Sequence, residues 1–292
     1  MKEVPKTYVI TGATSGIGLA LANDLVAQGM NVIGVGRSPE RCQDALTLLR
    51  TVNPWAKINY CLADLSLMQQ VRDLAQQVAN QLIVWGVEHL DGLVNNAASL
   101  PFHQTTTAEG LDTQWAVNYL SGFLLTDLLL EWMQKAPAAR IVSVSSASHY
   151  HTRMHWKDVQ LFHSYNPLKA YKHTKLAQVI FIAELNRRFQ SMPAMKAFAA
   201  DPGLVDTNIG YKGNSDLMSW IWKLRRRGGI PPEEAARGIA FLLTEPSIQN
   251  SNQIYWKHAQ PQSPNPRALD EASGQRLWVL SAQMCGLLEN IH

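Results

Sequence analysis

The sequence predicts an α/β protein: a doubly wound parallel sheet of about seven strands with helices on both faces. Two observations predict this fold class. Short runs rich in β-branched and aromatic residues alternate with longer helical patterns along the 292 residues. Residues able to carry chemistry follow several of these runs, and open α/β sheets bind their ligands at the carboxyl ends of the strands.

The first predicted strand, 7–11, ends in a glycine-rich turn. Residues 12–18 (GATSGIG) have the spacing G-x-x-x-G-x-G, and helical periodicity follows over 16–29. Glycines permit a tight turn and a close approach to a pyrophosphate, and a helix N-terminus favours the bound anion. We therefore interpret this turn as a dinucleotide site. An ordinary strand–helix connection is the alternative.

The second predicted strand, 31–36, indicates which dinucleotide is bound. Many NAD-binding proteins carry an acidic residue at the end of this strand, where it bonds the ribose hydroxyls. Gly36 occupies that place here, and Arg37 follows. Because an arginine can pair with a 2′-phosphate, we expect NADP(H) to be preferred, with NAD(H) left open. A solvated surface arginine is the alternative.

The later strands are predicted near 57–62, 91–95, 139–145, 195–200 and 252–256, and the further helices include 66–84, 111–135, 169–190 and 231–244. No internal repeat or low-complexity linker marks a second domain. Residues 1–292 are therefore predicted to form one domain.

The predicted helix 169–190 carries a candidate acid/base pair. Tyr171 and Lys175 are four residues apart and share one helix face. Free tyrosine loses its proton only near pH ~10, and a neighbouring ammonium lowers that pKa, so the pair suits proton transfer near neutral pH. Tyr165 and Lys169 have the same spacing. Pro167 between them disfavours a helical residue before it, so we expect that pair in a loop or at the start of the helix.

Several motifs stand in a fixed order: the glycine turn, Asn95-Asn96-Ala97-Ala98, Asn118, Ser143–Ser146, Tyr171 with Lys175, and Asp201–Thr207. Together they closely resemble the short-chain dehydrogenase/reductase superfamily from about Thr7 to Trp256. The resemblance implies a Rossmann-like NAD(P)-binding domain.

Within that superfamily the chain looks most like the branch of retinol dehydrogenases and light-dependent protochlorophyllide reductases. The long interval from Ser146 to Tyr171 and the tail from Ser263 to Leu287 carry this likeness. We expect the tail to be helical over about 265–288. The chain departs from the family at Ala98, where glycine is usual, and at Asp201, where histidine is common.

The resemblance also implies catalytic roles. Tyr171 would be the general acid in carbonyl reduction and the base in alcohol oxidation. Lys175 would lower the pKa of Tyr171 and hold the nicotinamide ribose. Ser146 would orient the substrate oxygen, and Asn118 would hold a water that links Lys175 to solvent. For Ser146 the alternative is a helix cap or a strand-end serine.

The cofactor-binding residues implied by the resemblance are Gly12, Thr14, Ser15, Gly16, Ile17, Gly18, Arg37, Asp64, Leu65, Asn95, Ala97, Tyr171, Lys175, Pro202, Gly203, Val205 and Thr207. Asp64 would bond the adenine, and Asn95 would close the cofactor cleft. Val205 and Thr207 would fix the carboxamide. The cofactor supplies the hydride, whereas the protein supplies position and the proton.

Composition argues against several other classes. A net charge of +3 gives no case for a nucleic-acid partner. Cys42, Cys61 and Cys285 show neither metal-ligand spacing nor a disulfide framework, as expected in a reducing cytosol. No apolar run reaches ~18 residues and no signal peptide is visible, so we expect a cytoplasmic protein without a membrane span.

Two segments leave alternatives open. Histidines gather at 148–165 and at His173, but no carboxylate or cysteine completes a metal-ligand set. We expect no metal site and interpret them as polar lining of the substrate entrance or as surface residues. Residues 211–230 mix tryptophan and leucine with a basic run, which favours an apolar substrate lid. A fixed helix packed on the core and peripheral membrane contact are the alternatives.

The leading hypothesis is an NADP(H)-dependent oxidoreductase acting on a carbonyl or alcohol of an apolar small molecule. A carbon–carbon double-bond reductase of the same superfamily is one alternative. A non-catalytic NADP-binding sensor or scaffold is another, and it predicts damaged catalytic positions, whereas all four are present. The substrate, the physiological direction and a homo-oligomer are left open.

Overall fold

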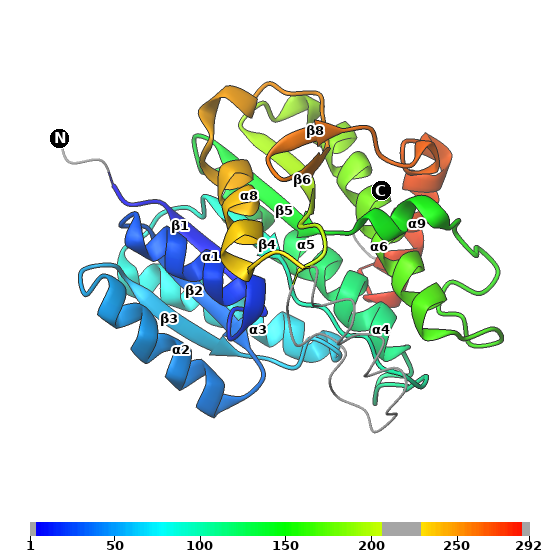
Figure 1. Ribbon diagram of the computed structural model, residues 1–292, viewed down its shortest axis with the longest axis horizontal. Coiled ribbons are helices and arrows are strands. Elements are labelled where there is room, and N and C mark those ends of the chain that lie inside the picture. Colours follow the sequence, from blue (N-terminus) through cyan, green and yellow to red (C-terminus); the bar gives the residue numbers. More distant parts are fainter. Residues whose placement is uncertain (1–3, 206–228, 288–292) are drawn as a thin grey trace.

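The computed structural model of the protein describes residues 4–205 and 229–287. Within them an eight-stranded sheet has the order β3-β2-β1-β4-β5-β6-β7-β8 (Figure 1). The strands are β1 (Thr7–Thr11), β2 (Asn31–Gly36), β3 (Ile58–Leu62), β4 (Gly92–Asn95), β5 (Ala139–Val144), β6 (Met195–Asp201), β7 (Tyr255–Lys257) and β8 (Gln260–Gln262). Neighbours from β3 to β7 pair in parallel, whereas β8 pairs antiparallel with β7. The seven predicted strands and the doubly wound order are confirmed.

The eighth strand, β8, is missing from the prediction. Its three residues are all exposed, so they show no alternation of apolar and polar side chains. A tight turn produces the strand: His258 and Ala259 both lie in the left-handed region, with φ of 48° and 58°. Such turns match the twist of paired strands, but they usually use Gly or Asn, which this turn lacks.

Helices cover both faces of the sheet (Figure 1). One face carries α1 (Gly16–Ala27), α2 (Pro39–Val52) and α8 (Pro232–Thr244), and the other carries α3 (Met68–Trp85), α5 (Ser121–Gln134), α6 (Pro167–Arg188) and α9 (Glu271–Met284). Strand β1 alternates between the two cores: Tyr8 and Ile10 pack towards α1, and Val9 packs towards α5. All three side chains are fully buried, as expected for a parallel sheet covered on both faces.

The predicted helix 111–135 is interrupted in the structure. It is divided into α4 (Thr113–Trp115), a π-helical turn over Ala116–Leu120 (η1), and α5. A π-turn inserts one extra residue into a helix, and the apolar run continues through it. The sequence therefore reads as one helix. The candidate residue Asn118 lies within this π-turn. Such turns are often found at functional sites.

The start of α6 is fixed by a cap. Asn166 Oδ1 accepts hydrogen bonds from the backbone N–H groups of Leu168 and Lys169, both at 3.1 Å. Pro167 is the first helical residue, where its missing N–H has no cost. Tyr165 lies in the preceding loop and Lys169 in the first turn, so the placement expected for this pair is confirmed.

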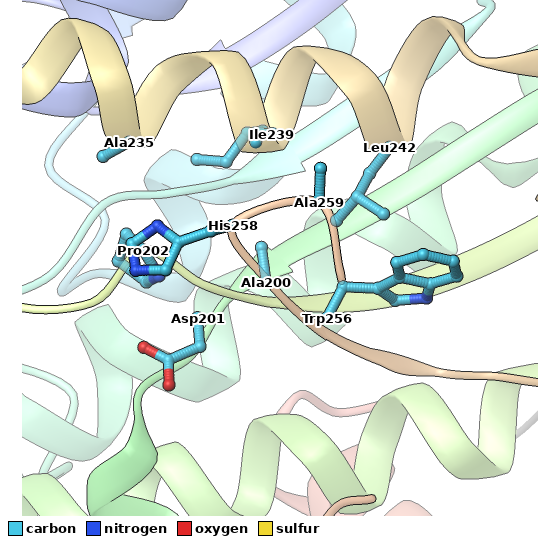
Figure 2. Close-up of a pocket in the computed structure, with 10 residues that line it drawn as sticks. Ala200, Asp201, Pro202, Ala235, Ile239, Leu242, Trp256, His258 and Ala259 are labelled. Carbon is cyan, nitrogen blue, oxygen red and sulfur yellow. The ribbon is translucent and has the colours of Figure 1, made fainter. Parts of the chain in front are cut away.

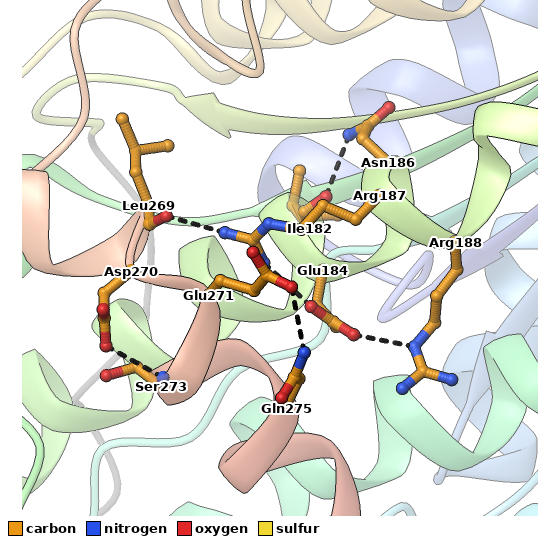
Figure 3. Close-up of polar contacts among 10 residues, drawn as sticks. All are labelled: Ile182, Glu184, Asn186, Arg187, Arg188, Leu269, Asp270, Glu271, Ser273 and Gln275. Carbon is orange, nitrogen blue, oxygen red and sulfur yellow. Dashed lines mark hydrogen bonds and ion pairs between the residues drawn. The ribbon is translucent and has the colours of Figure 1, made fainter.

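The C-terminal tail, expected to be helical over about 265–288, contains α9 over Glu271–Met284, which packs against α6 (Figure 3). The buried Glu184 of α6 binds Arg187 at 2.8 Å and Arg188 at 2.9 Å. The Arg188 guanidinium lies 3.8 Å from the ring centre of Trp278, whose ring also contacts Phe123 of α5. Helix α9 therefore covers the outer side of the helix that carries Tyr171 and Lys175.

No helix within 4–205 and 229–287 is long and apolar enough to cross a membrane. The cysteines Cys42, Cys61 and Cys285 are free and buried.

We predict that Gly18→Ala destabilises the protein by about 1–3 kcal/mol, the usual cost of overpacking. A Cβ at Gly18 would lie 2.3 Å from the backbone oxygen of Gly12, which cannot rotate away. Gly238→Ala in α8 is the matched control. Its Cβ would meet nothing closer than 3.6 Å, and better helix propensity should stabilise the protein by up to ~1 kcal/mol. Urea unfolding of the cofactor-free protein measures the free energy of unfolding of both variants. Equal changes in this free energy would contradict the close contact at Gly18.

Candidate active site

The candidate catalytic side chains meet at the carboxyl end of β5. Ser146 stands two residues beyond β5 and caps the 3-10 turn η2 (Ala147–His151), accepting a hydrogen bond from the Ser148 N–H at 3.2 Å. The capping role that was the alternative for Ser146 is therefore real. The Ser146 hydroxyl lies close enough to Tyr171 to lower its pKa. The Lys175 ammonium lies 5.4 Å from the centre of the Tyr171 ring. Three of the four predicted catalytic residues are thus assembled.

Lys175 is only 2% exposed and is bonded to β5 twice. Its Nζ donates to the carbonyl oxygen of Val144 at 2.7 Å, and its own carbonyl oxygen accepts from Ser145 Oγ at 3.0 Å. These bonds hold one turn of α6 against the end of the strand. Ser145 was not assigned by the sequence analysis, and its position directly before Ser146 is the only signal for it.

Burial dominates the protonation of this pair. It raises the pKa of Tyr171 to about 12, although the hydrogen bond with Ser146 lowers it; the charge of Asp201 raises it further. Burial also lowers the pKa of Lys175 to about 7, against the opposing effect of Asp201. Loss of hydration dominates the pKa of Tyr171, and its lowering by Lys175 stays a prediction. Tyr171 is held in its protonated form.

Asp201, the departure from the family at this position, is a buried carboxylate held by hydrogen bonds. Its Oδ2 accepts from the Tyr255 hydroxyl at 2.9 Å, and its Oδ1 accepts from the Gly203 N–H at 2.9 Å. Figure 2 shows the carboxylate directed away from α8, while the His258 ring lies beside Pro202. The crevice there has a volume of about 10 Å³, room for about one water, and is too small for an organic substrate.

His149 joins the site to the C-terminal tail. The ring is fully buried, its Nε2 accepts from the Asn265 N–H at 3.1 Å, and its Nδ1 lies 2.8 Å from the Ser146 carbonyl oxygen. Because Nε2 accepts a hydrogen bond, it carries no proton. The ring proton is therefore on Nδ1, which donates a hydrogen bond to the Ser146 carbonyl, and the ring is neutral. Burial lowers the pKa of His149, which agrees with this state.

His173 is buried as well, so the surface interpretation of the histidines is wrong for two of them. Its Nε2 accepts from the His155 N–H at 3.0 Å, and burial lowers the pKa of His173 to about 3. Among the residues that the structure describes, no three histidine, cysteine or acidic side chains gather as metal ligands would.

Asn118 serves the architecture around the site. Its Oδ1 accepts from the Ser99 N–H at 2.6 Å, and its Nδ2 donates to the Ser99 carbonyl at 3.0 Å and to Thr174 Oγ1 at 3.3 Å. Its carbonyl oxygen accepts from Gln178 Nε2 at 2.6 Å. The π-turn is thereby tied to α6, on which Lys175 lies. The water link to Lys175 stays a prediction.

The glycine turn has the form that a dinucleotide phosphate requires. Gly12 and Gly16 adopt φ of +66° and +54°, and a Cβ at Gly12 would lie 3.0 Å from Ala97 Cα. At the start of α1, Ser15 makes no side-chain cap and no acidic residue occupies the first turn. The helix N-terminus is therefore free to bind an anion, with Thr14 and Ile17 in the same turn. The residues present fit a dinucleotide.

Asn96 braces this turn, a contact that the sequence analysis missed. Its Nδ2 donates to the carbonyl oxygens of Thr11 at 2.8 Å and Gly12 at 3.3 Å. Thr11 Oγ1 accepts from the N–H groups of Asn96 and Ala97. Asn95, the predicted cofactor residue, instead donates to Thr126 Oγ1 of α5 at 3.1 Å. Its role in the cleft stays a prediction.

Arg37 and Asp64 lie together beyond β2 and β3. Arg37 Nη1 is 3.4 Å from Asp64 Oδ2, and the Arg37 side chain remains 65% exposed, so its other donors can reach a ligand. Hydrogen bonds from Ser66 and the charge of Arg37 lower the pKa of Asp64, although burial opposes them. Leu65 is buried beside them.

The remaining predicted cofactor residues follow β6. Pro202 and Gly203 turn the chain, with a φ of +76° at Gly203. Val205 forms a β-bridge with Ile230. Thr207 and almost all of the proposed lid, 211–230, lie outside the described residues.

Comparisons with known proteins agree with this site. The family model for short chain dehydrogenases matches residues 6–217. The chain belongs to the short-chain dehydrogenase family. It is 32% identical to mouse retinol dehydrogenase 13 over 97% of this chain and 84% of that protein. It is 28% identical to human polyprenol dehydrogenase over 97% of this chain and 86% of that protein. The retinol-dehydrogenase-like branch is confirmed.

Solved structures confirm the fold of this short-chain dehydrogenase. An uncharacterized protein from Mycobacterium paratuberculosis aligns with a TM-score of 0.73 at 28% identity, covering 97% of this chain and 96% of that one. An alcohol dehydrogenase from Thermococcus sibiricus, complexed with 5-hydroxy-NADP, aligns with a TM-score of 0.66 at 21% identity, covering 89% and 100%. The protein is thus an NAD(P)(H)-dependent oxidoreductase acting on alcohol or carbonyl groups.

The lowered pKa of Lys175 predicts a pH dependence of stability. The folded state releases the proton near pH 7, whereas an unfolded lysine keeps it to about pH 10.4. Between these values the unfolded state binds more protons. The free energy of unfolding of the cofactor-free protein should therefore rise with pH relative to that of Lys175→Met. Urea unfolding of both proteins across this window tests the sign, and a constant or shrinking difference would contradict it.

Proposed function

We propose that the protein is an NADP(H)-dependent dehydrogenase/reductase that transfers a hydride between the nicotinamide and an alcohol or carbonyl group of an apolar substrate. One observation carries the proposal. Ser146, Tyr171 and Lys175 gather at the carboxyl end of β5, where Lys175 Nζ bonds the Val144 carbonyl and lies 5.4 Å from the centre of the Tyr171 ring. The same edge of the sheet holds the glycine turn. A substrate oxygen reaching both hydroxyls would face a cofactor bound at that turn.

When bound, NADPH would supply a hydride to the carbonyl carbon. The carbonyl oxygen gains negative charge at that moment and needs a proton. Tyr171 is the proposed donor, because its raised pKa keeps it protonated at neutral pH. The Ser146 hydroxyl would hold the same oxygen by a hydrogen bond that strengthens as the charge develops. Alcohol oxidation would use the same groups with Tyr171 as the base.

The choice of NADP(H) is supported by two features at the end of β2. A Cβ at Gly36 would lie 2.5 Å from both Thr14 Cγ2 and Cys42 Sγ, so an acidic side chain for the ribose hydroxyls does not fit there. Arg37 follows with most of its guanidinium exposed. Its contact with Asp64 is a single long one, which leaves donors for a 2′-phosphate.

The apolar substrate class is supported by the relatives. Several relatives are named retinol dehydrogenases and one is named polyprenol dehydrogenase, so isoprenoid alcohols and aldehydes are the first candidates for this chain. A sensor or scaffold role has less support, because Ser146, Tyr171 and Lys175 are present and assembled.

Tyr171→Phe should lower kcat on an apolar aldehyde by roughly 10²- to 10⁴-fold, since it removes the proton donor. The dissociation constant for NADPH should change little. Tyr165→Phe is the matched control: it also deletes one phenol hydroxyl, here one bonded to Gln114 and Pro101, away from the proposed chemistry. Steady-state assays with a panel of retinoid and polyprenoid aldehydes, followed at the NADPH absorbance, measure the effect. Wild-type turnover in Tyr171→Phe would refute the assignment.

Arg37→Ala should weaken NADPH binding by about tenfold or more, because a charge-assisted contact contributes ~1.5–3 kcal/mol. Binding of NADH should change little, so the preference for NADPH should narrow. Titration calorimetry with both cofactors tests this. An unaltered ratio of the two dissociation constants, or tighter NADH binding by the wild type, would rule out the role of Arg37.

A further inference from the structure

A second concavity lies on the substrate side of the molecule, outside the group of Ser146, Tyr171 and Lys175. It has a volume of about 440 Å³, within the usual range of small-molecule sites, and a wide mouth. Three segments form it: residues 150–155, which include the end of η2, the first turn of α6, and η5 (Pro266–Ala268).

The lining of this concavity carries only one sign of permanent charge. Arg153, Lys169 and Arg267 contribute to it together with His151 and His155, and no acidic residue among those in 4–205 and 229–287 lines it. None of the three cations forms an ion pair with any residue in 4–205 or 229–287. Like charges gathered without direct ion pairs repel one another, so internal pairing gives no account of the cluster.

The positive field reaches the neighbouring histidine. Burial lowers the pKa of His155, and Lys169 and Arg153 lower it further, against the opposing charge of Asp158. The Lys169 ammonium has Ser164 Oγ as its hydrogen-bond partner at 2.9 Å, a neutral group that leaves its charge uncompensated.

The walls are held in place by protein contacts alone. The buried Asn265 side chain donates to the carbonyl oxygens of His149 at 2.9 Å and Thr152 at 3.3 Å. Its Oδ1 accepts from the Arg267 N–H at 3.1 Å, and the Tyr150 hydroxyl donates to the Ser263 carbonyl at 2.5 Å. The cationic side chains therefore project from a preformed frame, which lowers the entropy cost of binding an anion.

The concavity and the catalytic group lie on different sides of α6. Lys169 and Tyr171 are two residues apart, which turns them about 200° around the helix axis. Tyr171 points to Ser146, and Lys169 points into the concavity. His149 touches both regions, because it binds Ser146 on one side and Asn265 on the other.

We infer that this concavity is a binding site for a phosphate monoester, separate from the nicotinamide site. Two guanidinium groups and one ammonium match the two negative charges and the oxygen geometry of such a group. The hydroxyl of Thr152 lines the same wall. The phosphate could belong to a small soluble molecule or to a lipid headgroup.

The test uses phenyl phosphate as the soluble probe, titrated into the full chain by calorimetry with saturating NADP⁺ present to fill the cofactor site. The double variant Lys169→Gln/Arg267→Gln should weaken binding by tenfold or more, as expected for lost charge-assisted contacts. The control Arg50→Gln/Arg237→Gln removes the same charge from exposed positions on α2 and α8, and its affinity should equal that of the wild type.

A parallel arm measures sedimentation with phosphatidylcholine vesicles containing phosphatidic acid, a lipid phosphate monoester. Binding of phenyl phosphate supports a soluble ligand, and binding of vesicles alone supports a lipid headgroup. Either kind of binding supports the site only if the Lys169→Gln/Arg267→Gln variant loses that binding and the Arg50→Gln/Arg237→Gln control keeps it. Absence of both, or equal losses in the two double variants, would overturn the inference. If the double variant fails to fold, the wild type is acetylated with and without phenyl phosphate, and the acetylation of Lys169 is read by mass spectrometry. Protection of Lys169 by phenyl phosphate would support the site, and an unprotected Lys169 would overturn it.

Discussion

The hydrogen bond from Lys175 Nζ to the carbonyl oxygen of Val144 is the interaction on which the rest of the site depends. It gives the buried Lys175 amino group a hydrogen-bond partner in the last residue of β5, and a buried polar group needs such a partner. The return bond from Ser145 to the Lys175 carbonyl locks the same turn of α6 to the strand. With these bonds made, Ser146 follows directly from the strand, and Tyr171 lies one helical turn from Lys175, facing it. The cap at Asn166 sets where α6 starts and thereby sets this register.

Around this centre the buried polar groups form a connected set. Asp201 accepts hydrogen bonds from Tyr255 and Gly203. The His149 ring is hydrogen-bonded to the Ser146 carbonyl on one side and to Asn265 in the tail on the other. A buried polar group without a partner costs free energy, so each of these contacts also fixes the position of its neighbour. Ser146 is consequently linked through His149 to Asn265, more than a hundred positions away in the chain.

The parts of this structure that local patterns encode could be predicted. Strands β1 to β7 show apolar runs, the glycine turn requires its glycines, and Tyr171 and Lys175 meet through helical spacing alone. Other features arise only from tertiary contacts. The π-turn at Asn118 keeps the apolar run of a helix, and β8 consists of three exposed residues. Whether the pKa of Tyr171 is raised or lowered depends on how much water the fold removes from its hydroxyl, and the spacing of residues in the sequence does not reveal this. The contacts of Asn96, His149 and Asn265 join segments that no periodicity relates.

The packing of α9 on α6 bears on the order in which the chain can fold during synthesis. Strands β1 to β3 and helices α1 and α2 are complete within the first 62 residues, so the glycine turn can form early. Phe123 and Phe181 pack against Trp278, and Tyr119 bonds Ser281, so these side chains are covered only after α9 has been synthesised. Until those residues leave the ribosome, the helix bearing Tyr171 exposes apolar surface. The nascent chain therefore carries an uncovered apolar face on α6 until late in its synthesis, when α9 becomes available to pack on it.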